Sequence, residues 1–408
     1  MRNCSPLISF SLFLILDCRS IVRFFCSFPM RRCLALRKAS EFVVKKDYDM
    51  TRVITLNRVK GLNSLNLEML GALRELVVEQ PHPSATALTI LKSATPKAFS
   101  TGGDVIEQTA GDASKVLGQW SCLQGLTDYQ ILISSAPFVS LLNGYLMGGA
   151  AGLGFNERYR VVSETTQFAM PECGIGFFPN GGASWFLPRV PVKGLGLYLA
   201  LTGARLKGAD NVHAGLGTHY VSSSRLDELE KTLVAQKDHF HLPTILSSFQ
   251  EPLPPLTLEK ELPVLEKAFS MGPDTSVEGI IETLKTLEDS SSLAKSALST
   301  IHACCPLSLK VTLELHKLSP KWTDYFEALQ HEIYTAQALG AQPDFKEGVR
   351  AQLVEKTKDP RWSRTLDQVT PDVVKSMIGT SRKGFYAIYT PKDGAINNIK
   401  SIQYGIST

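Results

Sequence analysis

One glutamate stands in a setting where a carboxylate could do chemistry. Glu172 follows Pro171 inside the apolar stretch 168–190, which reads FAMPECGIGFFPNGGASWFLPRV. Carboxylates are seldom buried without a partner or a purpose. Burial would raise the pKa of the Glu172 side chain and suit it to act as a general base or a nucleophile. The same local sequence is equally compatible with an acid that caps a helix at the surface.

Two glycine-rich stretches could supply backbone donors to the same chemistry. Residues 97–105 read KAFSTGGDV and residues 143–155 read NGYLMGGAAGLGF, and each follows a run typical of a buried strand. Glycine lets the backbone turn tightly and approach a ligand closely. Two such loops at the ends of neighbouring strands could aim two N–H groups at one carbonyl oxygen, which would form an oxyanion hole. Either loop alone is also compatible with an ordinary turn from strand to helix.

Alternating strand and helix patterns indicate how these segments are positioned. Apolar, mostly β-branched runs predict strands, and leucines at helical spacing within residues 62–80 predict a helix. The predicted strands are 41–46, 51–58, 87–94, 137–146 and 158–164. Two strands, a helix and then repeated strand and helix units favour an α/β fold with parallel pairing.

The second half of the chain has a mostly helical pattern. Residues 193–236 are expected to turn helical, and Pro243 to Pro255 is interpreted as a proline-rich connector at a boundary. We therefore expect an α/β core over residues 41–242 and a helical C-terminal region over residues 243–365. Residues 366–408 are interpreted as a C-terminal extension.

The first 40 residues are expected to target the chain rather than to fold. Residues 8–16 form an apolar run that is too short to span a membrane. From Met30 the sequence MRRCLALRKAS is rich in arginine and free of acids, as in a mitochondrial presequence. We expect a mitochondrial matrix protein whose folded part begins near Glu41, with a disordered tail as the alternative.

Charge and cysteine placement limit the classes of partner. The net charge of +4 comes from 43 basic and 39 acidic residues, which is too even a balance for binding DNA by bulk electrostatics. No membrane partner is expected either. Beyond the first 40 residues the cysteines are Cys122, Cys173, Cys304 and Cys305, and none has zinc-site spacing. We expect reduced thiols and no metal site.

Several motifs in the same order resemble one known family. AFSTGGD and NGYLMGG look like the oxyanion loops of the crotonase (enoyl-CoA hydratase/isomerase) superfamily. The stretch 168–190 and the block DFKEGVRAQLVEKTKDPRW, residues 344–362, are similar to its 3-hydroxyisobutyryl-CoA hydrolase branch. The similarity spans residues 42 to about 365. It implies an α/β fold of the crotonase type, a spiral of ββα units followed by a helical C-terminal region.

The resemblance implies a role for each matching position. The backbone N–H groups of Thr101 and Gly149 would form the oxyanion hole for a thioester carbonyl. Glu172 falls on the family's catalytic glutamate, which attacks the thioester or activates water. Gly152 falls where hydratases of the superfamily keep a second glutamate, so hydration of an enoyl-CoA is disfavoured.

Two positions depart from the family's pattern by losing a charge. A second active-site acid of the family, an aspartate, is Asn180 here. A substrate-contacting glutamate appears, by an ungapped count, as Gln124, for which a plain helix-surface residue is the alternative. Asn180 could still bind a substrate hydroxyl, but it cannot act as a carboxylate.

Three functions follow from these expectations. The first is hydrolysis of 3-hydroxyisobutyryl-CoA, or a similar 3-hydroxyacyl-CoA, to the free acid and coenzyme A in mitochondrial valine breakdown. The second is a hydrolase-like structural subunit of the mitochondrial ribosome small subunit, with weak or no catalysis. The third is a related acyl-CoA hydrolase or isomerase with a changed substrate preference. No separate cofactor is implied, since coenzyme A arrives with the substrate, and the oligomeric state stays open.

Five further residues can be interpreted from their local sequence. Asp104 is expected to cap the helix that follows it, and Glu347 and Arg350 to form a structural ion pair on a helix. Lys97 and Arg189 are candidate contacts for coenzyme A phosphates, and Arg189 lies at the end of the Glu172 stretch.

Overall fold

The computed structural model of the protein describes residues 41–78 and 88–378. The predicted targeting segment, residues 1–40, and residues 379–408 of the predicted extension lie outside the described residues.

Ten strands form two sheets within these ranges. The first sheet has the order β1-β2-β3-β5-β7-β10 and the second has the order β4-β6-β8-β9. The strand pairs are parallel except for β1 with β2 and β8 with β9. The strands are β1 (Val43–Asp47), β2 (Thr51–Leu56), β3 (Leu88–Ser93), β4 (Ala98–Ser100), β5 (Phe138–Leu142), β6 (Tyr145–Met147), β7 (Tyr159–Val162), β8 (Gln167–Ala169), β9 (Leu206–Lys207) and β10 (His219–Tyr220). This arrangement confirms the predicted α/β fold.

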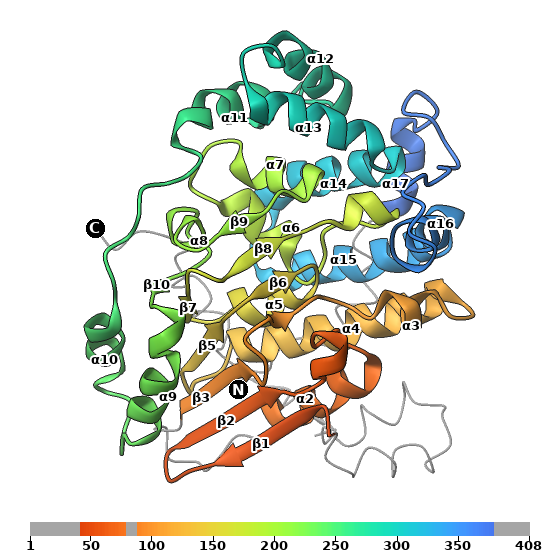
Figure 1. The fold of residues 1–408 in the computed structure, drawn as a ribbon. Coiled ribbons are helices and arrows are strands. Elements are labelled where there is room, and N and C mark those ends of the chain that lie inside the picture. The colour runs from red at the N-terminus through yellow and green to blue at the C-terminus, as the bar shows by residue number, and fades with distance from the viewer. Residues whose placement is uncertain (1–40, 79–87, 379–408) are drawn as a thin grey trace, which may run out of the picture.

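Successive strands alternate between the two sheets. β3, β5 and β7 belong to the six-stranded sheet, whereas β4, β6 and β8, which follow them, belong to the four-stranded sheet. A helix comes after each pair, so the chain winds as a spiral of ββα units (Figure 1). The short strands β4, β6 and β8 end next to one another, because β6 pairs with both of the others. This places the two glycine-rich loops and Glu172, which follow those strands, at one edge of the smaller sheet.

The helices of the core surround the sheets. They are α2 (Leu67–Val78), α3 (Val105–Thr109), α4 (Ala113–Leu132), α5 (Ala150–Phe155), α6 (Ala183–Phe186), α7 (Leu195–Thr202), α8 (Asp210–His213), α9 (Leu226–Val234) and α10 (Leu242–Phe249). Short 3-10 turns include η2 (Val59–Gly61) and η3 (Glu172–Ile175), the second of which carries the predicted catalytic glutamate. α4 is the central helix of the site, because it packs against α2, α3 and α5.

The C-terminal region is helical, as predicted, and covers the core. Its helices are α11 (Leu262–Phe269), α12 (Val277–Leu287), α13 (Ser292–Ala303), α14 (Pro306–Leu318), α15 (Tyr325–Gly340), α16 (Pro343–Val349), the π-helix η8 (Arg350–Val354) and α17 (Pro371–Ile378). α11, α12 and α13 lie at the top in Figure 1, and α15 packs along α4. α17 packs on α14 and α15, so the helical region reaches Ile378 and extends past the boundary predicted at residue 365.

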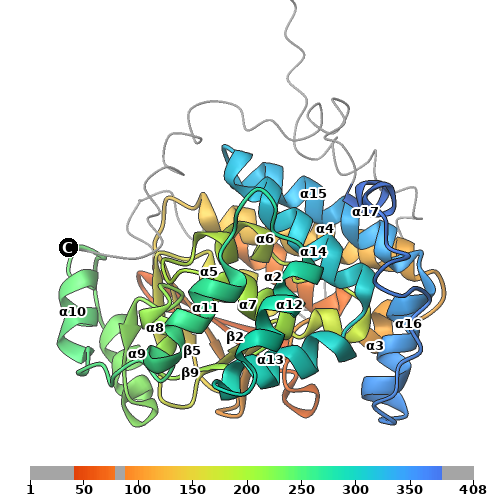
Figure 2. The same ribbon diagram turned by 90° about the horizontal axis from the view of Figure 1, so that it is seen from above.

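The proline-rich connector differs from its prediction. Its first part is α10, which begins at Leu242 and carries a proline in its first turn. Proline is tolerated there because the first N–H groups of a helix have no partner within the helix. Only the segment after Phe249 is extended, and α10 packs beside α9 at one edge of the molecule (Figure 2).

Candidate active site

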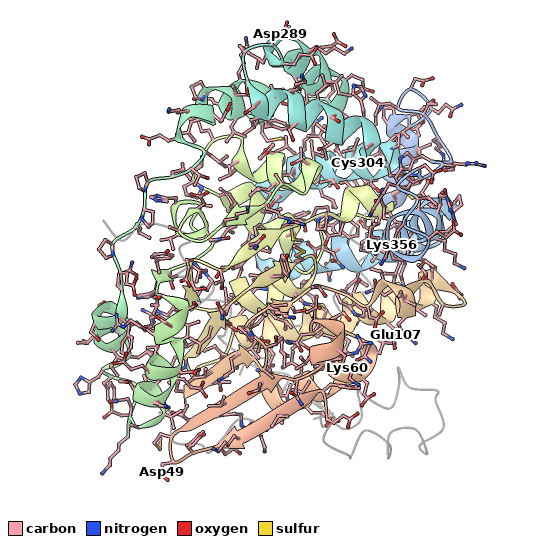
Figure 3. The ribbon with its side chains drawn as sticks, viewed as in Figure 1. Asp49, Lys60, Glu107, Asp289, Cys304 and Lys356 are labelled. Carbon is pink, nitrogen blue, oxygen red and sulfur yellow. The ribbon has the colours of Figure 1, made fainter. Side chains whose placement is uncertain are left out.

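A cavity of about 1030 Å³ opens between the core and the helical C-terminal region. Both glycine-rich loops line it, together with the segment around Glu172 and residues from the ends of α13 and η8. Three of its lining residues, Lys60, Cys304 and Lys356, are marked in Figure 3 and come from segments that are far apart in the sequence. The cavity therefore joins all three stretches in which the sequence predicts chemistry.

Glu172 is buried at the wall of this cavity, and one of its carboxylate oxygens is unpaired. It is the first residue of η3 and only 6% exposed, and its Oε2 atom has no hydrogen-bond partner among the described residues. Burial raises the pKa of the carboxyl to about 8, the residue's own backbone N–H lowers it somewhat, and the nearby Glu332 carboxyl raises it further. The alternative of a surface helix cap is wrong. A carboxyl with a raised pKa and an unpaired oxygen is the kind of group that proton transfer or attack would need.

Glycines let the two loops approach each other and the carboxylate. A Cβ atom at Gly102 would lie 2.7 Å from the carbonyl oxygen of Met147, and one at Gly148 would lie 2.7 Å from Oε1 of Glu172. Both glycines have positive φ angles, +90° and +54°, which L side chains rarely adopt. Side chains at either position would separate the loops or displace the glutamate.

Gly149 is placed as a backbone donor to the cavity. It lines the cavity, and no acceptor within the described residues takes its N–H. Its carbonyl oxygen, in contrast, accepts hydrogen bonds from Nε2 of Gln124 at 2.7 Å and from the N–H of Gly152 at 3.2 Å. The carbonyl of Gly149 is thus engaged, whereas its N–H is available. This is the arrangement that the predicted oxyanion hole requires.

Thr101, the second predicted donor, also lines the cavity, but its N–H is engaged. It donates to the carbonyl oxygen of Leu62 at 3.2 Å, near the long end of the normal range. Leu62 and Asn63 have φ angles of +49° and +56°, so this turn is held in a conformation rarely adopted by residues other than glycine. A substrate carbonyl at Thr101 would share this N–H with Leu62 or displace it.

Asn180 lies beside Gly149 at the cavity wall. Its Oδ1 atom is 3.2 Å from the position that a Cβ atom of Gly149 would take, and its carboxamide makes no hydrogen bond within the described residues. The turn that follows is anchored by Glu332 of α15, which accepts the N–H groups of Gly182 at 2.8 Å and of Ser184 at 3.0 Å. Asn180 is therefore a neutral polar group with free hydrogen-bonding capacity facing the site.

Gln124 lies behind the wall rather than in it. It is 1% exposed on α4, is absent from the cavity lining and donates to the Gly149 carbonyl. The alternative of a helix-surface residue is wrong, and a direct substrate contact does not fit its place in the structure. The physical reason is that the Gly149 backbone lies between the Gln124 side chain and the cavity.

Gly152 leaves no room for the second acid of a hydratase. A Cβ atom there would lie 2.3 Å from Oδ2 of Asp128 and 2.4 Å from the carbonyl oxygen of Gly181. Gly152 is also absent from the cavity lining. Glycine is therefore required by packing at this position.

Four cations at the cavity rim were missed by the sequence analysis. Lys60, Arg205, Lys356 and Lys358 line the cavity, whereas Lys97 and Arg189, the candidates for phosphate contacts, do not. Arg189 instead stacks on Trp185 and donates to Ser319 at 2.7 Å, which is a structural role. The four rim cations come from three distant segments, so no local sequence pattern could have grouped them.

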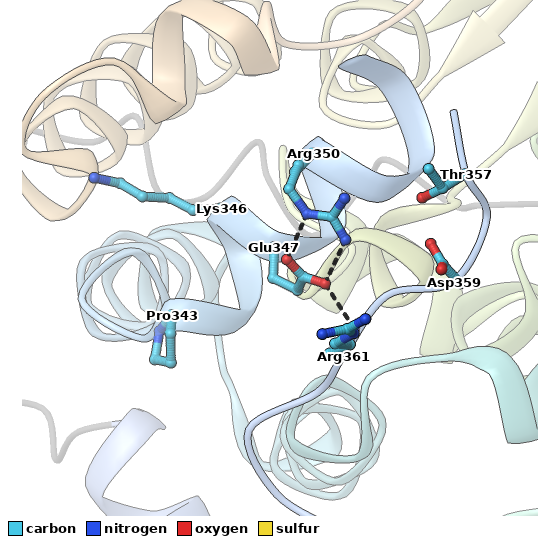
Figure 4. Close-up of a pocket in the computed structure, with 7 residues that line it drawn as sticks. All are labelled: Pro343, Lys346, Glu347, Arg350, Thr357, Asp359 and Arg361. Carbon is cyan, nitrogen blue, oxygen red and sulfur yellow. Dashed lines mark hydrogen bonds and ion pairs between the residues drawn. The ribbon is translucent and has the colours of Figure 1, made fainter. Parts of the chain in front are cut away.

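The block at residues 344–362 forms a second, smaller cavity of about 630 Å³ held by an ion pair (Figure 4). Arg350 donates two hydrogen bonds of 2.8 Å to Glu347, and the N–H of Arg361 adds one of 2.7 Å. These contacts hold the pKa of Glu347 at about 2. The predicted structural ion pair is confirmed, as is Asp104, which caps α3 by accepting the N–H of Glu107.

Three further features of the described residues concern metal ligands, thiols and membrane spans. Residues 41–78 and 88–378 contain no group of three or more histidine, cysteine or acidic side chains arranged to hold a metal ion. Cys122, Cys173, Cys304 and Cys305 are free thiols. Within the same ranges, no helix is both apolar enough and long enough to span a bilayer.

Comparison with known proteins identifies the family of the chain. A profile of the enoyl-CoA hydratase/isomerase family matches residues 51–378. The mitochondrial 3-hydroxyisobutyryl-CoA hydrolase of Xenopus tropicalis is 40% identical over 334 residues, covering 79% of this chain and 85% of the relative. The human protein of the same name is 36% identical over 349 residues, covering 82% of this chain and 87% of the relative. None of the eight relatives compared is named a ribosomal protein, so the comparisons lend no support to that alternative.

Solved structures share the fold. A carnitinyl-CoA dehydratase from Mycobacterium thermoresistibile superposes with a TM-score of 0.76 at 29% identity, covering 84% of this chain and 98% of that chain. An enoyl-CoA hydratase from Rhodobacter sphaeroides gives a TM-score of 0.73, also at 29% identity and with the same coverage. The chain therefore belongs to the enoyl-CoA hydratase/isomerase (crotonase) family, and within it to the 3-hydroxyisobutyryl-CoA hydrolase branch.

Proposed function

We propose that the protein hydrolyses 3-hydroxyisobutyryl-CoA, or a close 3-hydroxyacyl-CoA, to the free acid and coenzyme A. One observation carries the proposal. Glu172, buried with its Oε2 atom unpaired, and Gly149, with an available N–H, line the same cavity. Relatives named for this hydrolysis cover about four fifths of the chain at 35–40% identity.

In the proposed reaction the thioester carbonyl lies with its oxygen toward the Gly149 N–H and its carbon toward Glu172. The Glu172 carboxylate either removes a proton from an attacking water or attacks the carbon itself and forms a mixed anhydride that water then cleaves. In the first route the water oxygen replaces the sulfur on the acyl carbon. In the second route a Glu172 oxygen replaces the sulfur, and water then breaks the anhydride and restores the Glu172 carboxylate. In both routes one water is consumed, and the coenzyme A thiolate leaves and takes up a proton. The Gly149 N–H stabilises the negative charge on the carbonyl oxygen, and Thr101 adds a second donor when it turns from Leu62.

Asn180 suits the hydroxyl of the acyl group. Its carboxamide can donate and accept hydrogen bonds beside Gly149 and adds no charge to a site that already holds Glu172. Hydration of an enoyl-CoA is not proposed, because Gly152 has no space for a second carboxylate. Glu172 is thus the one acid of the proposed reaction.

The rim cations suit the phosphates of coenzyme A. Lys60 and Arg205 stand on the core side of the cavity, and Lys356 and Lys358 on the C-terminal side. We propose that they attract the anionic end of the substrate, while the acyl end reaches Glu172. No separate cofactor is proposed, and the proposed place of action is the mitochondrial matrix, in valine breakdown.

The test is to measure thioester hydrolysis by the purified protein through the release of the free coenzyme A thiol. The wild-type protein is expected to turn over 3-hydroxyisobutyryl-CoA, and Glu172→Gln to lose at least about a thousandfold in kcat. A panel with acetyl-CoA, isobutyryl-CoA and 3-hydroxypropionyl-CoA measures the contribution of the hydroxyl. Equal rates for the wild-type protein and Glu172→Gln would contradict the proposal.

A further inference from the structure

Gln124 makes an unusual set of contacts for a buried side chain. Its Nε2 atom donates to the Gly149 carbonyl at 2.7 Å and lies 3.2 Å from Oδ2 of Asp128, one helical turn further along α4. Gln124 is 1% exposed and Asp128 is fully buried. Both hydrogens of one amide group are therefore directed to two buried oxygens.

The space between the Gly149 carbonyl oxygen and the Asp128 carboxyl suits a hydrogen-bond donor. The Gly149 carbonyl and the Asp128 carboxyl both accept hydrogen bonds, and the amide nitrogen lies between them. A carboxylate at position 124 would face both oxygens with no hydrogen to share, unless one carboxyl of the pair took up a proton. The glutamine thus fits this place in a way that an ionised glutamate would not.

The Gly149 backbone is confined on its other sides too. A Cβ atom at Gly149 would lie 2.5 Å from the Trp120 ring, and one at Gly181 would lie 2.5 Å from the Gly149 carbonyl oxygen. Trp120 is itself fixed, since its Nε1 donates to the Leu65 carbonyl at 2.8 Å. The packing limits translation of this backbone, and two donors hold its carbonyl, the Gln124 amide at 2.7 Å and the more distant Gly152 N–H at 3.2 Å.

We propose that Gln124 is a positioning residue, which holds the Gly149 carbonyl from behind and thereby keeps the Gly149 N–H directed at the cavity. The catalytic part of this inference rests on the proposed hydrolysis. The carbonyl and the N–H belong to the two planar peptide groups that meet at the Gly149 Cα atom. A hydrogen bond that fixes the carbonyl restrains the ψ angle and the position of this Cα atom, and through the Cα atom it restrains where the N–H points. Gln124 acts on the reaction through Gly149 and touches no substrate.

Two substitutions separate positioning from packing. Gln124→Met keeps the length of the side chain and removes the donor, so kcat is expected to fall about ten- to a hundredfold with KM within about twofold. Thr127→Val is the matched control. Thr127 is also buried on α4, and its hydroxyl bonds only to the Leu123 carbonyl of the same helix. It should leave both constants unchanged.

Gln124→Glu adds a readout that packing alone would not move. The introduced carboxyl can donate to the Gly149 carbonyl only when protonated, so the activity of this variant relative to the wild-type protein should fall as pH rises. The titratable groups around this position are Asp128 on α4, Glu157 after α5, Glu332 on α15 and Glu172 across Gly149. All four are acids, which favours the protonated form of the new carboxyl.

Hydrogen exchange followed by mass spectrometry tests the positioning independently of turnover. Peptides covering residues 146–155 should exchange faster in Gln124→Met than in the wild-type protein or Thr127→Val. Unchanged exchange there would overturn the inference, whatever the kinetics show. Faster exchange with an inactive wild-type protein would leave the positioning in place and reject the proposed function. Faster exchange with kcat unchanged in an active enzyme would overturn its catalytic importance.

Discussion

The carboxylate of Glu172 borders the space that a side chain at Gly148 would need. A Cβ atom at Gly148 would be 2.7 Å from Oε1, well inside van der Waals contact. The neighbouring residue, Gly149, supplies the available N–H. The two adjacent glycines therefore have different roles. Gly148 makes space for the Glu172 carboxylate, and Gly149 offers an N–H donor to the thioester carbonyl of the proposed substrate.

Gly148→Ala is expected to disable the site. The added methyl group meets the Glu172 carboxylate, and the φ angle of +54° adds backbone strain of about 1 kcal/mol or more. We expect kcat to fall at least about a hundredfold. Gly111→Ala is the control, because Gly111 also has a positive φ angle, +66°, lies outside the cavity lining, and its Cβ atom would meet nothing within 4 Å. Full activity of Gly148→Ala would show that the carboxylate does not act from this position.

The pH profile should follow the ionisation of Glu172. Burial raises the pKa of this carboxyl to about 8, so most of it is protonated at pH 7. Either proposed role needs the carboxylate, and kcat/KM should therefore rise with pH and level off above about 8. Initial rates between about pH 5.5 and 9.5 provide the measurement. A profile already flat from pH 6 would argue against a buried, unpaired base.

Glu172→Gln should stabilise the folded protein at alkaline pH. The folded-state pKa of about 8 lies above the ordinary value of 4.5, so the wild-type protein loses stability as pH rises between these values. The glutamine variant has no such loss. At pH 8.5 we expect its free energy of unfolding to be higher by roughly 1–3 kcal/mol, with little difference at pH 4.5. Urea titrations at both pH values measure it. A destabilised variant at pH 8.5 would contradict the account.

Asn180→Asp should move the pH profile to higher pH. The new carboxylate would share the cavity with Glu172, and a nearby like charge disfavours ionisation and raises the pKa of that residue. The rising limb of kcat/KM should shift upward. Asn180→Leu, which has similar size and no charge, should leave the limb in place while weakening discrimination for 3-hydroxyacyl substrates. If the rising limb of kcat/KM lies at the same pH in Asn180→Asp as in the wild-type protein, the side chains at positions 180 and 172 are too far apart to interact.

Removing rim cations should weaken binding without slowing the chemistry. Lys60→Ala and Arg205→Ala are expected to raise KM for the coenzyme A thioester about two- to tenfold at low salt, with kcat nearly unchanged. The difference from the wild-type protein should shrink as ionic strength rises. Lys295→Ala is the control, since Lys295 is exposed on α13 and lies outside the cavity lining. An effect on kcat alone would assign these cations another role.

Much of the core could be predicted from the sequence because its strands have strong local patterns. The runs predicted as β1, β2, β3 and β7 match the elements found, whereas the single strand predicted at 137–146 is two strands, β5 and β6, in different sheets. The strands β4, β8, β9 and β10 have only two or three residues each, too few to give a periodic signal. α10 could not be predicted by treating Pro243 as a helix breaker, because this proline occupies a first helical turn.

The sequence identified those cavity residues that lie in continuous motifs, and it missed features that depend on contacts between distant segments. Glu172, Gly149 and Asn180 lie in continuous motifs, and all three line the cavity. Gln124 was expected to contact substrate, yet its place behind Gly149 depends on how α4 packs against the loop after β6. The engagement of Thr101 with Leu62 depends on a turn whose left-handed residues have no glycine to mark them.

A crystal structure of Glu172→Gln with 3-hydroxyisobutyryl-CoA tests the central claim most directly. The thioester oxygen is expected within about 3 Å of the Gly149 nitrogen, and the thioester carbon within about 3.5 Å of the side chain at position 172. The acyl hydroxyl should meet Asn180, and the phosphates should lie at the rim cations. A thioester bound outside this cavity, or with its carbonyl turned away from Gly149, would contradict the account.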